Sequence, residues 1–225
     1  MTRKINFVSL LLVLAVLYGC QKSISTLTVK SPSDTNEVQI SLDGQGSMYY
    51  LVMHNGKVVI DTSYVGFELK DQPALAKDLT IVSSESTSQN ETWEMPWGEQ
   101  REVVNNYNQM TLHLEEMKEP KRKFDLIFKV YDDGIGFRYH FPEQEALSEV
   151  IITDENTQFK LTGNPMVWWI PGDWDIYEHM YNTTPFNKIN AISKRNHPNL
   201  AATYIPENAV NTPVTMKTED GIYLS

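Results

Sequence analysis

The sequence has almost no cysteine, which limits how the chain can be stabilised. Among its 225 residues only Cys20 carries a thiol, so no disulfide can form within the chain and no cluster of thiolates is available for zinc. Glycine-rich phosphate loops and the strained serine turn of the α/β-hydrolases are also absent from the sequence. The folded part must therefore depend on an ordinary hydrophobic core.

Positive charge is scarce as well. The chain has 19 basic and 29 acidic residues and a formal net charge of -10. Nothing in this balance attracts a phosphate backbone, so no nucleic-acid partner is expected. The five histidines have no spacing that suggests a metal site or a nucleophilic triad, and we expect them at the surface or on strand faces. A hydrophobic content of 41% excludes a disordered tail or a collagen-like rod.

The one long hydrophobic run lies near the N-terminus, at residues 7–17, after Arg3 and Lys4. It is too short for a membrane span, and it is followed by Gly19 and Cys20 in the pattern of a secretory signal. The pattern resembles a bacterial lipoprotein processing site, which predicts a signal peptide over 1–20 and lipidation of Cys20. Ordinary signal cleavage stays open because Tyr18 is larger than usual there. The sequence predicts a periplasmic or outer-membrane protein that touches the membrane only through a lipid anchor.

Residues 21–36 are rich in polar residues and predict a linker, with a folded domain over 37–225. Short apolar segments of strand length follow, separated by turn signals such as Asp43-Gly44 and Asn55-Gly56. A helix is expected only around 176–181. Many short strands with frequent turns predict an all-β fold, a sandwich of mostly antiparallel strands. The last strand, near 222–224, has only just begun at Ser225, so we expect the domain to be incomplete at its C-terminus.

The clearest predicted hairpin joins the strands 124–131 and 135–141 through Asp132-Asp133-Gly134. Gly134 is expected to supply a positive φ in the turn. In the second strand the residues Ile135, Phe137, Tyr139 and Phe141 share one face, which predicts their burial.

Aromatic and acidic side chains gather at residues 168–181. Aromatic faces can stack on sugar rings, and carboxylates can accept hydrogen bonds from sugar hydroxyls or bind Ca²⁺. We therefore expect Trp168, Trp169, Trp174 and Asp175 to bind an oligosaccharide, although an aromatic core edge with solvated acids would explain the same pattern. No complete calcium loop is present. A second such cluster, at 93–99, is better explained by tryptophans that close one end of the sandwich.

Several segments resemble the N-terminal domain of family 97 glycoside hydrolases in order and spacing. They are 97–99, 105–108, the hairpin 130–142, 155–159 and 177–181. The resemblance covers nearly the whole mature chain. It implies a β-super-sandwich of the galactose-mutarotase-like type, which is followed in the full-length enzyme by a (β/α)₈ barrel. Members of the family are exported, calcium-dependent, exo-acting α-glucosidases or α-galactosidases.

The resemblance also implies a division of roles between the domains. The catalytic acid and the base or nucleophile lie in the barrel, so no catalytic residue is expected in this chain. The Glu of the family's Tyr-Glu motif is a calcium ligand, which is Glu178 here. One carboxylate supplies few of the oxygens that Ca²⁺ takes, so weak or no calcium binding is expected from this chain alone. The alternatives are a stand-alone oligosaccharide-binding lipoprotein without catalysis and, from the fold only, a sugar epimerase.

Overall fold

The structure is a computed structural model that describes residues 26–195 and 203–225, so Cys20 and the predicted signal peptide lie outside the described residues. The chain divides into two compact units, Met1–Lys160 and Leu161–Ser225. The sequence predicted one continuous domain over 37–225, whereas the structure separates that range after Lys160. Each unit is described by itself.

The first sheet of the first unit has the strand order β1-β2-β3-β4-β12. Its strands are β1 (Leu27–Lys30), β2 (Asn36–Leu42), β3 (Met48–His54), β4 (Lys57–Tyr64) and β12 (Lys160–Leu161). The predicted linker 21–36 is wrong in its second half, because β1 pairs antiparallel with β2 and buries Val29. The turn between β3 and β4 is the predicted one, with positive φ at Asn55 and Gly56.

The second sheet has the order β10-β9-β8-β7. Its strands are β7 (Leu79–Glu94), β8 (Glu102–Glu116), β9 (Lys123–Tyr131) and β10 (Ile135–His140). The predicted hairpin of β9 and β10 is confirmed in register, with Phe128 opposite Phe137. The prediction for Gly134 is wrong, since its φ is not among the positive values. Long-range hydrogen bonds hold the turn instead, because the Asp132 carboxylate accepts from the backbone N–H and the hydroxyl of Ser33 at 2.9 and 2.6 Å.

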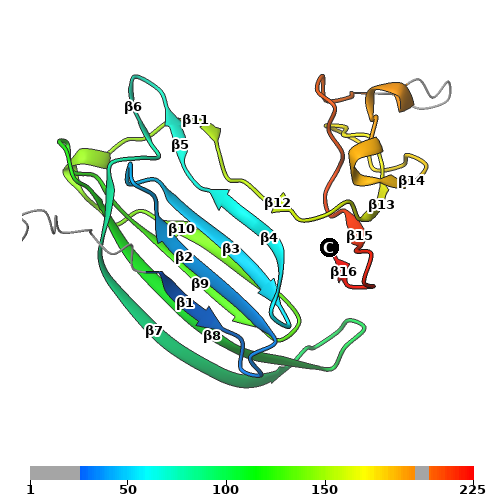
Figure 1. Ribbon diagram of the computed structural model, residues 1–225, viewed down its shortest axis with the longest axis horizontal. Helices are drawn as coiled ribbons and strands as arrows, with labels where there is room; N and C mark the ends of the chain where they lie inside the picture. The colour runs from blue at the N-terminus through cyan, green and yellow to red at the C-terminus, as the bar shows by residue number, and fades with distance from the viewer. Residues whose placement is uncertain (1–25, 196–202) are drawn as a thin grey trace, which may run out of the picture. The chain divides into compact units, whose positions relative to one another are not determined.

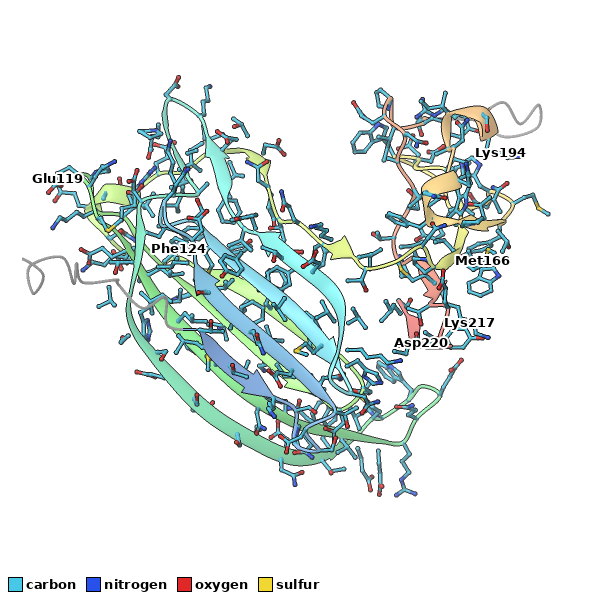
Figure 2. The ribbon with its side chains drawn as sticks, viewed as in Figure 1. Glu119, Phe124, Met166, Lys194, Lys217 and Asp220 are labelled. Carbon is cyan, nitrogen blue, oxygen red and sulfur yellow. The ribbon has the colours of Figure 1, made fainter. Side chains whose placement is uncertain are left out.

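The two sheets pack face to face as layers of a sandwich (Figure 1). Tyr50 of β3 reaches across the core to Phe128 and Phe137, with ring centroids 5.7 and 5.4 Å apart. Phe124, labelled in Figure 2, is only 2% exposed. The alternation predicted for β10 is observed, because Ile135, Phe137 and Tyr139 are partly buried while the residues between them are exposed. The predicted burial of Phe141 is wrong, because this residue follows the end of β10 and is 37% exposed. Aromatic packing between the layers therefore confirms the all-β sandwich.

A third small sheet, of order β11-β5-β6, lies at one end of this unit. Its strands are β5 (Phe67–Leu69), β6 (Gln72–Leu75) and β11 (Ile152–Glu155). A fully buried arginine, Arg122, lies in the segment between β8 and β9 and binds this segment to β6. It donates to the Glu116 carboxylate through Nε at 2.7 Å and Nη2 at 2.6 Å, and to the carbonyl of Pro73 at 2.9 Å.

The hairpin of β7 and β8 runs past the neighbouring strands (Figure 1). β7 and β8 pair along their whole length, but β9 covers β8 only from Tyr107 to Glu115. The rest of the hairpin is a two-stranded ribbon with Trp93 44% and Trp97 81% exposed near its tip. The prediction that these tryptophans close one end of the sandwich is therefore wrong.

The second unit contains a sheet of order β14-β13-β15-β16. Its strands are β13 (Met166–Trp169), β14 (Asn182–Pro185), β15 (Thr215–Lys217) and β16 (Tyr223–Leu224). Figure 2 labels Met166 and Lys217, which are opposite each other in register. The core of this unit consists of Val167, Trp169, Ala191 and Met216.

Helix is scarce in the part of the chain that the structure describes. Three single turns of 3₁₀ helix occur there, at Glu145–Leu147, Phe186–Lys188 and Ile192–Lys194. The predicted helix around 176–181 is wrong, because that segment is an irregular loop. None of the helical segments described is long and apolar enough to cross a membrane.

Candidate functional site

The loop between β13 and β14 carries most of the candidate site residues, and one buried carboxylate organises it. Asp173 Oδ1 accepts hydrogen bonds from the N–H groups of Asp175 and Ile176, at 3.0 and 3.3 Å, and from the Thr203 hydroxyl at 2.7 Å. Its Oδ2 lies 3.1 Å from His179 Nε2 and accepts from Thr203 N–H at 3.3 Å. The carboxylate thus joins Asp175, Ile176 and His179 of the loop to Thr203, a residue 30 positions away in the sequence.

Burial and hydrogen bonding act in opposite directions on Asp173. Burial by itself raises the pKa of this carboxyl group, but hydrogen bonds from Thr203, Asp175, His179 and Ile176 outweigh it and hold the pKa well below the usual range. The group is therefore a carboxylate at any pH where the protein would work. A buried charge of this kind is stable only when its lone pairs are satisfied, as they are here.

His179 is buried, which the sequence did not predict. It is 8% exposed and stacks on the Tyr204 ring with centroids 5.1 Å apart. The expectation that each histidine lies exposed or free on a strand face is wrong at this position, because the Asp173 carboxylate gives the imidazole a polar partner inside the unit. No spacing in the sequence signals this pairing, since the two residues lie six positions apart in an irregular loop.

Glu178, the predicted calcium ligand, is exposed. Its Oε2 accepts from the N–H of Tyr177 at 3.2 Å. Both neighbours are anchored by their side chains, because the Tyr177 hydroxyl donates to the carbonyl of Thr212 and His179 lies against Asp173. The loop therefore holds the backbone on either side of Glu178, while the Glu178 side chain itself is exposed.

The three predicted tryptophans differ in environment. Trp169 is 1% exposed in the core and donates from Nε1 to the Thr184 hydroxyl at 2.9 Å, so its predicted sugar contact is wrong because no ring face is free. Trp168 lies on the other face of β13, half-buried, and stacks on Tyr223 with an interplanar angle of 18°. Trp174 is 71% exposed. The period-two alternation of β13 separates Trp168 from Trp169.

Asp175, the fourth residue predicted to bind sugar, is exposed beside Trp174. Among the described residues, no group of three His, Cys, Asp or Glu side chains gathers in a way that could hold a metal ion. The loop thus carries one exposed tryptophan and two exposed carboxylates, Trp174, Asp175 and Glu178. Such a set can stack on a sugar ring, accept hydrogen bonds from its hydroxyls and give part of a shell to a hard cation.

The chain matches a known protein family over almost all of its described length. The sequence model described as "Glycosyl-hydrolase 97 N-terminal" matches residues 29–225. Solved structures of a glycoside hydrolase family 97 enzyme from Pseudoalteromonas sp. strain K8, in complex with panose and with acarbose, are 32% identical to the chain with a TM-score of 0.75. The match covers 88% of this chain and 27% of that enzyme.

A crystal structure of a β-arabinopyranosidase also matches, over 69% of this chain and 26% of that one, with a TM-score of 0.61. At 22% identity it shows only that the fold is shared. The chain spans about a quarter of the length of these relatives. The family match and the sandwich confirm the resemblance found in the sequence. The chain therefore belongs to glycoside hydrolase family 97 and corresponds to its N-terminal domain.

Proposed function

We propose that this chain is the N-terminal domain of a calcium-dependent, exo-acting α-glycosidase, an α-glucosidase or an α-galactosidase. In this proposal it contributes Glu178 as a calcium ligand, and Trp174 with Trp168 and Asp175 as part of the wall of the substrate site. A catalytic (β/α)₈ barrel supplies the acid and the base or nucleophile. The observation that carries the proposal is the exposed Glu178 carboxylate, held in a loop whose neighbouring residues are both anchored.

The donor set of the loop fits a calcium ion that is completed from elsewhere. Ca²⁺ takes about six to eight oxygen ligands, and carboxylates are the preferred charged ones. Glu178 keeps an oxygen free of any described hydrogen bond, so it can give one or two of these ligands without breaking the loop. A bound Ca²⁺ would orient sugar hydroxyls and stabilise negative charge in the site.

The relatives support a sugar substrate. The Pseudoalteromonas enzyme binds panose and acarbose, and the exposed Trp174 with its carboxylate neighbours offers the chemistry that sugar rings need. The choice between glucosides and galactosides depends on the barrel, so both substrate classes belong in the test.

The test uses a chimera in which residues 29–225 replace the matched segment of the Pseudoalteromonas enzyme. Hydrolysis of p-nitrophenyl α-glucoside and α-galactoside is measured while Ca²⁺ is titrated after treatment with a chelator. We expect Glu178→Gln to raise the Ca²⁺ concentration for half-maximal activity about tenfold, because affinity depends on the charge and number of ligands. The matched control is Glu219→Gln, at an exposed carboxylate in the turn between β15 and β16. Equal calcium dependence of the two variants would contradict the proposal.

The exposure of Trp174 also favours a second candidate, an oligosaccharide-binding lipoprotein that acts without a barrel. Titration calorimetry of the chain with maltooligosaccharides separates the two. Binding by the chain alone that is lost in Trp174→Ala would support the second candidate, and no heat at millimolar sugar would exclude it.

We propose further that the protein is exported to the periplasm or the outer membrane through its N-terminal signal, with Cys20 as the lipidated residue. Labelling with radioactive palmitate in a Gram-negative host tests this. Wild-type chain should take up label and Cys20→Ser should not, whereas a processed but unlabelled wild-type chain would indicate ordinary signal cleavage.

A further inference from the structure

The loop that carries Glu178 is closed on a single carboxylate. Asp173 receives hydrogen bonds from Ile176, two residues before Glu178, and contacts His179, the residue after it. The same carboxylate is tied to a distant segment through the hydroxyl and the N–H of Thr203. The backbone on both sides of Glu178 is thus fixed to one buried point.

A second set of contacts fixes the same loop from another side. Asn211 accepts from Asp173 N–H at 3.0 Å and donates to the Ile176 carbonyl at 3.5 Å, and the Tyr177 hydroxyl donates to the carbonyl of Thr212. The Glu178 side chain makes one described hydrogen bond, to the N–H of its own neighbour. The loop is therefore rigid where its backbone is anchored, while the carboxylate that it presents remains available.

We propose that Asp173 is a positioning residue for Glu178, holding its carboxylate in place for a divalent cation through the hydrogen bonds to Thr203, to the loop N–H groups and to His179. This inference rests on the proposed function of Glu178 as a calcium ligand. Asp173 itself is 8% exposed and its oxygens are occupied, so it does not coordinate the ion. Residues that hold a metal ligand in place before the ion arrives reduce the conformational entropy that the ligand loses on binding.

The test measures Tb³⁺ binding to the chelator-treated chimera with the Pseudoalteromonas enzyme, whose barrel supplies the remaining ligands, with tryptophan excitation and Tb³⁺ emission as the signal. Tb³⁺ is a hard cation that takes oxygen ligands as Ca²⁺ does, and Trp174 is four residues from Glu178. The part of the emission that Glu178→Gln removes defines the Glu178 site. In Thr203→Val the Asp173 carboxylate loses its shortest hydrogen bond without any change of charge. We expect half-saturation of the Glu178 site at about tenfold higher Tb³⁺ in this variant.

The matched control is Thr218→Val, which removes a similar threonine hydroxyl that donates to Asp220 at 2.6 Å elsewhere in the same unit. It should bind Tb³⁺ as wild type does. Amide hydrogen exchange of Asp175 and Ile176 gives a second readout, which should quicken in Thr203→Val and not in Thr218→Val. Asp173→Asn should weaken binding in the same direction, and if it does not fold, Thr203→Val decides.

The outcomes separate the two proposals. If Glu178→Gln removes no Tb³⁺ emission, the proposed ligand role of Glu178 fails, and the positioning role fails with it. If Glu178→Gln removes emission but Thr203→Val binds Tb³⁺ like Thr218→Val, the ligand role stands and the positioning role is wrong. If Asp173→Asn weakens binding and Thr203→Val does not, the effect comes from the charge of Asp173 acting through space. This result also overturns the positioning role.

Discussion

At the residue scale, the clearest stabilising feature is the buried ion pair of Arg122 and Glu116. Arg122→Met leaves the Glu116 carboxylate buried without its partner, so we expect the free energy of unfolding to fall by about 3–5 kcal/mol. Urea denaturation measures the change. The control is Arg101→Met, which breaks an exposed pair with Glu94 and should cost less than about 1 kcal/mol. Equal losses in the two variants would show that the buried pair has no special role.

Asp125 links acid stability to two histidines of the same sheet. His113 and His140 each place Nδ1 2.7 Å from a different oxygen of this carboxylate. Burial raises the pKa of Asp125. The hydrogen bonds from His140 and His113 lower it by more than burial raises it, so the net pKa is below the usual value. The ionised Asp125 therefore stabilises the folded state. This stabilisation is complete above the ordinary carboxyl pKa of about 4 and is lost as pH falls through the lower pKa that Asp125 has in the folded state.

The expected result is a shallower acid dependence in Asp125→Asn. Between about pH 5 and pH 3, its free energy of unfolding should fall less steeply than that of wild type, because one carboxylate with a lowered pKa is missing. Urea denaturation at a series of pH values measures the slope. Asp133→Asn, in the nearby turn, controls for the loss of one carboxylate charge as such. A wild-type slope in Asp125→Asn would contradict the prediction.

At the element scale, the β7–β8 hairpin should vary in stability along its length. Its distal part is a two-stranded ribbon, and such ribbons are marginally stable in water. We expect amide hydrogens at 90–93 and 103–106 to exchange at least about tenfold faster than those at 110–114, which lie between two strands. Exchange followed by mass spectrometry or NMR measures this. Equal protection along the hairpin would show that another part of the protein or a second copy covers the ribbon.

The elements that the sequence predicted share a clear alternation of apolar and polar residues. The hairpin of β9 and β10 could be placed in register because its aromatic face is continuous. The distal part of β7 could not, since its Ser, Thr and Glu residues are exposed on both faces. The expected helix at 176–181 failed for a tertiary reason. Asp173 accepts hydrogen bonds from backbone N–H groups as a helix N-cap would. The contacts of Tyr177 and His179, however, hold the chain in an irregular loop.

The candidate site was only partly predictable for the same reason. The family-like Tyr-Glu motif singled out Glu178 as a candidate ligand, but the helix expected around it is an exposed loop in the structure. The roles of Asp173 and Thr203 depend on a contact between residues 30 positions apart, which no local pattern encodes. Trp169 could have been assigned to the core, because it shares the inward face of β13 with Val167.

At the scale of the whole molecule, large apolar side chains remain exposed in both units. They include Trp97 at 81%, Trp174 at 71% and Met180 at 79%. Exposed apolar surface of this kind promotes association, so we expect the isolated chain to self-associate as its concentration rises. Size-exclusion chromatography with light scattering tests this, and a variant with Trp97→Ser and Trp174→Ser should associate less. A monodisperse monomer at high concentration that binds no hydrophobic dye would contradict the expectation.

This chain is the N-terminal domain of a family 97 glycoside hydrolase, and we propose that it takes part in catalysis without carrying the catalytic pair. Hydrolysis of p-nitrophenyl α-glucoside and α-galactoside, by the chain alone and by the chimera with the Pseudoalteromonas enzyme, tests it most directly. We expect no turnover by the chain and calcium-dependent turnover by the chimera. Turnover by the purified chain that survives in Glu178→Gln would place a complete active site within these residues and overturn the proposed function.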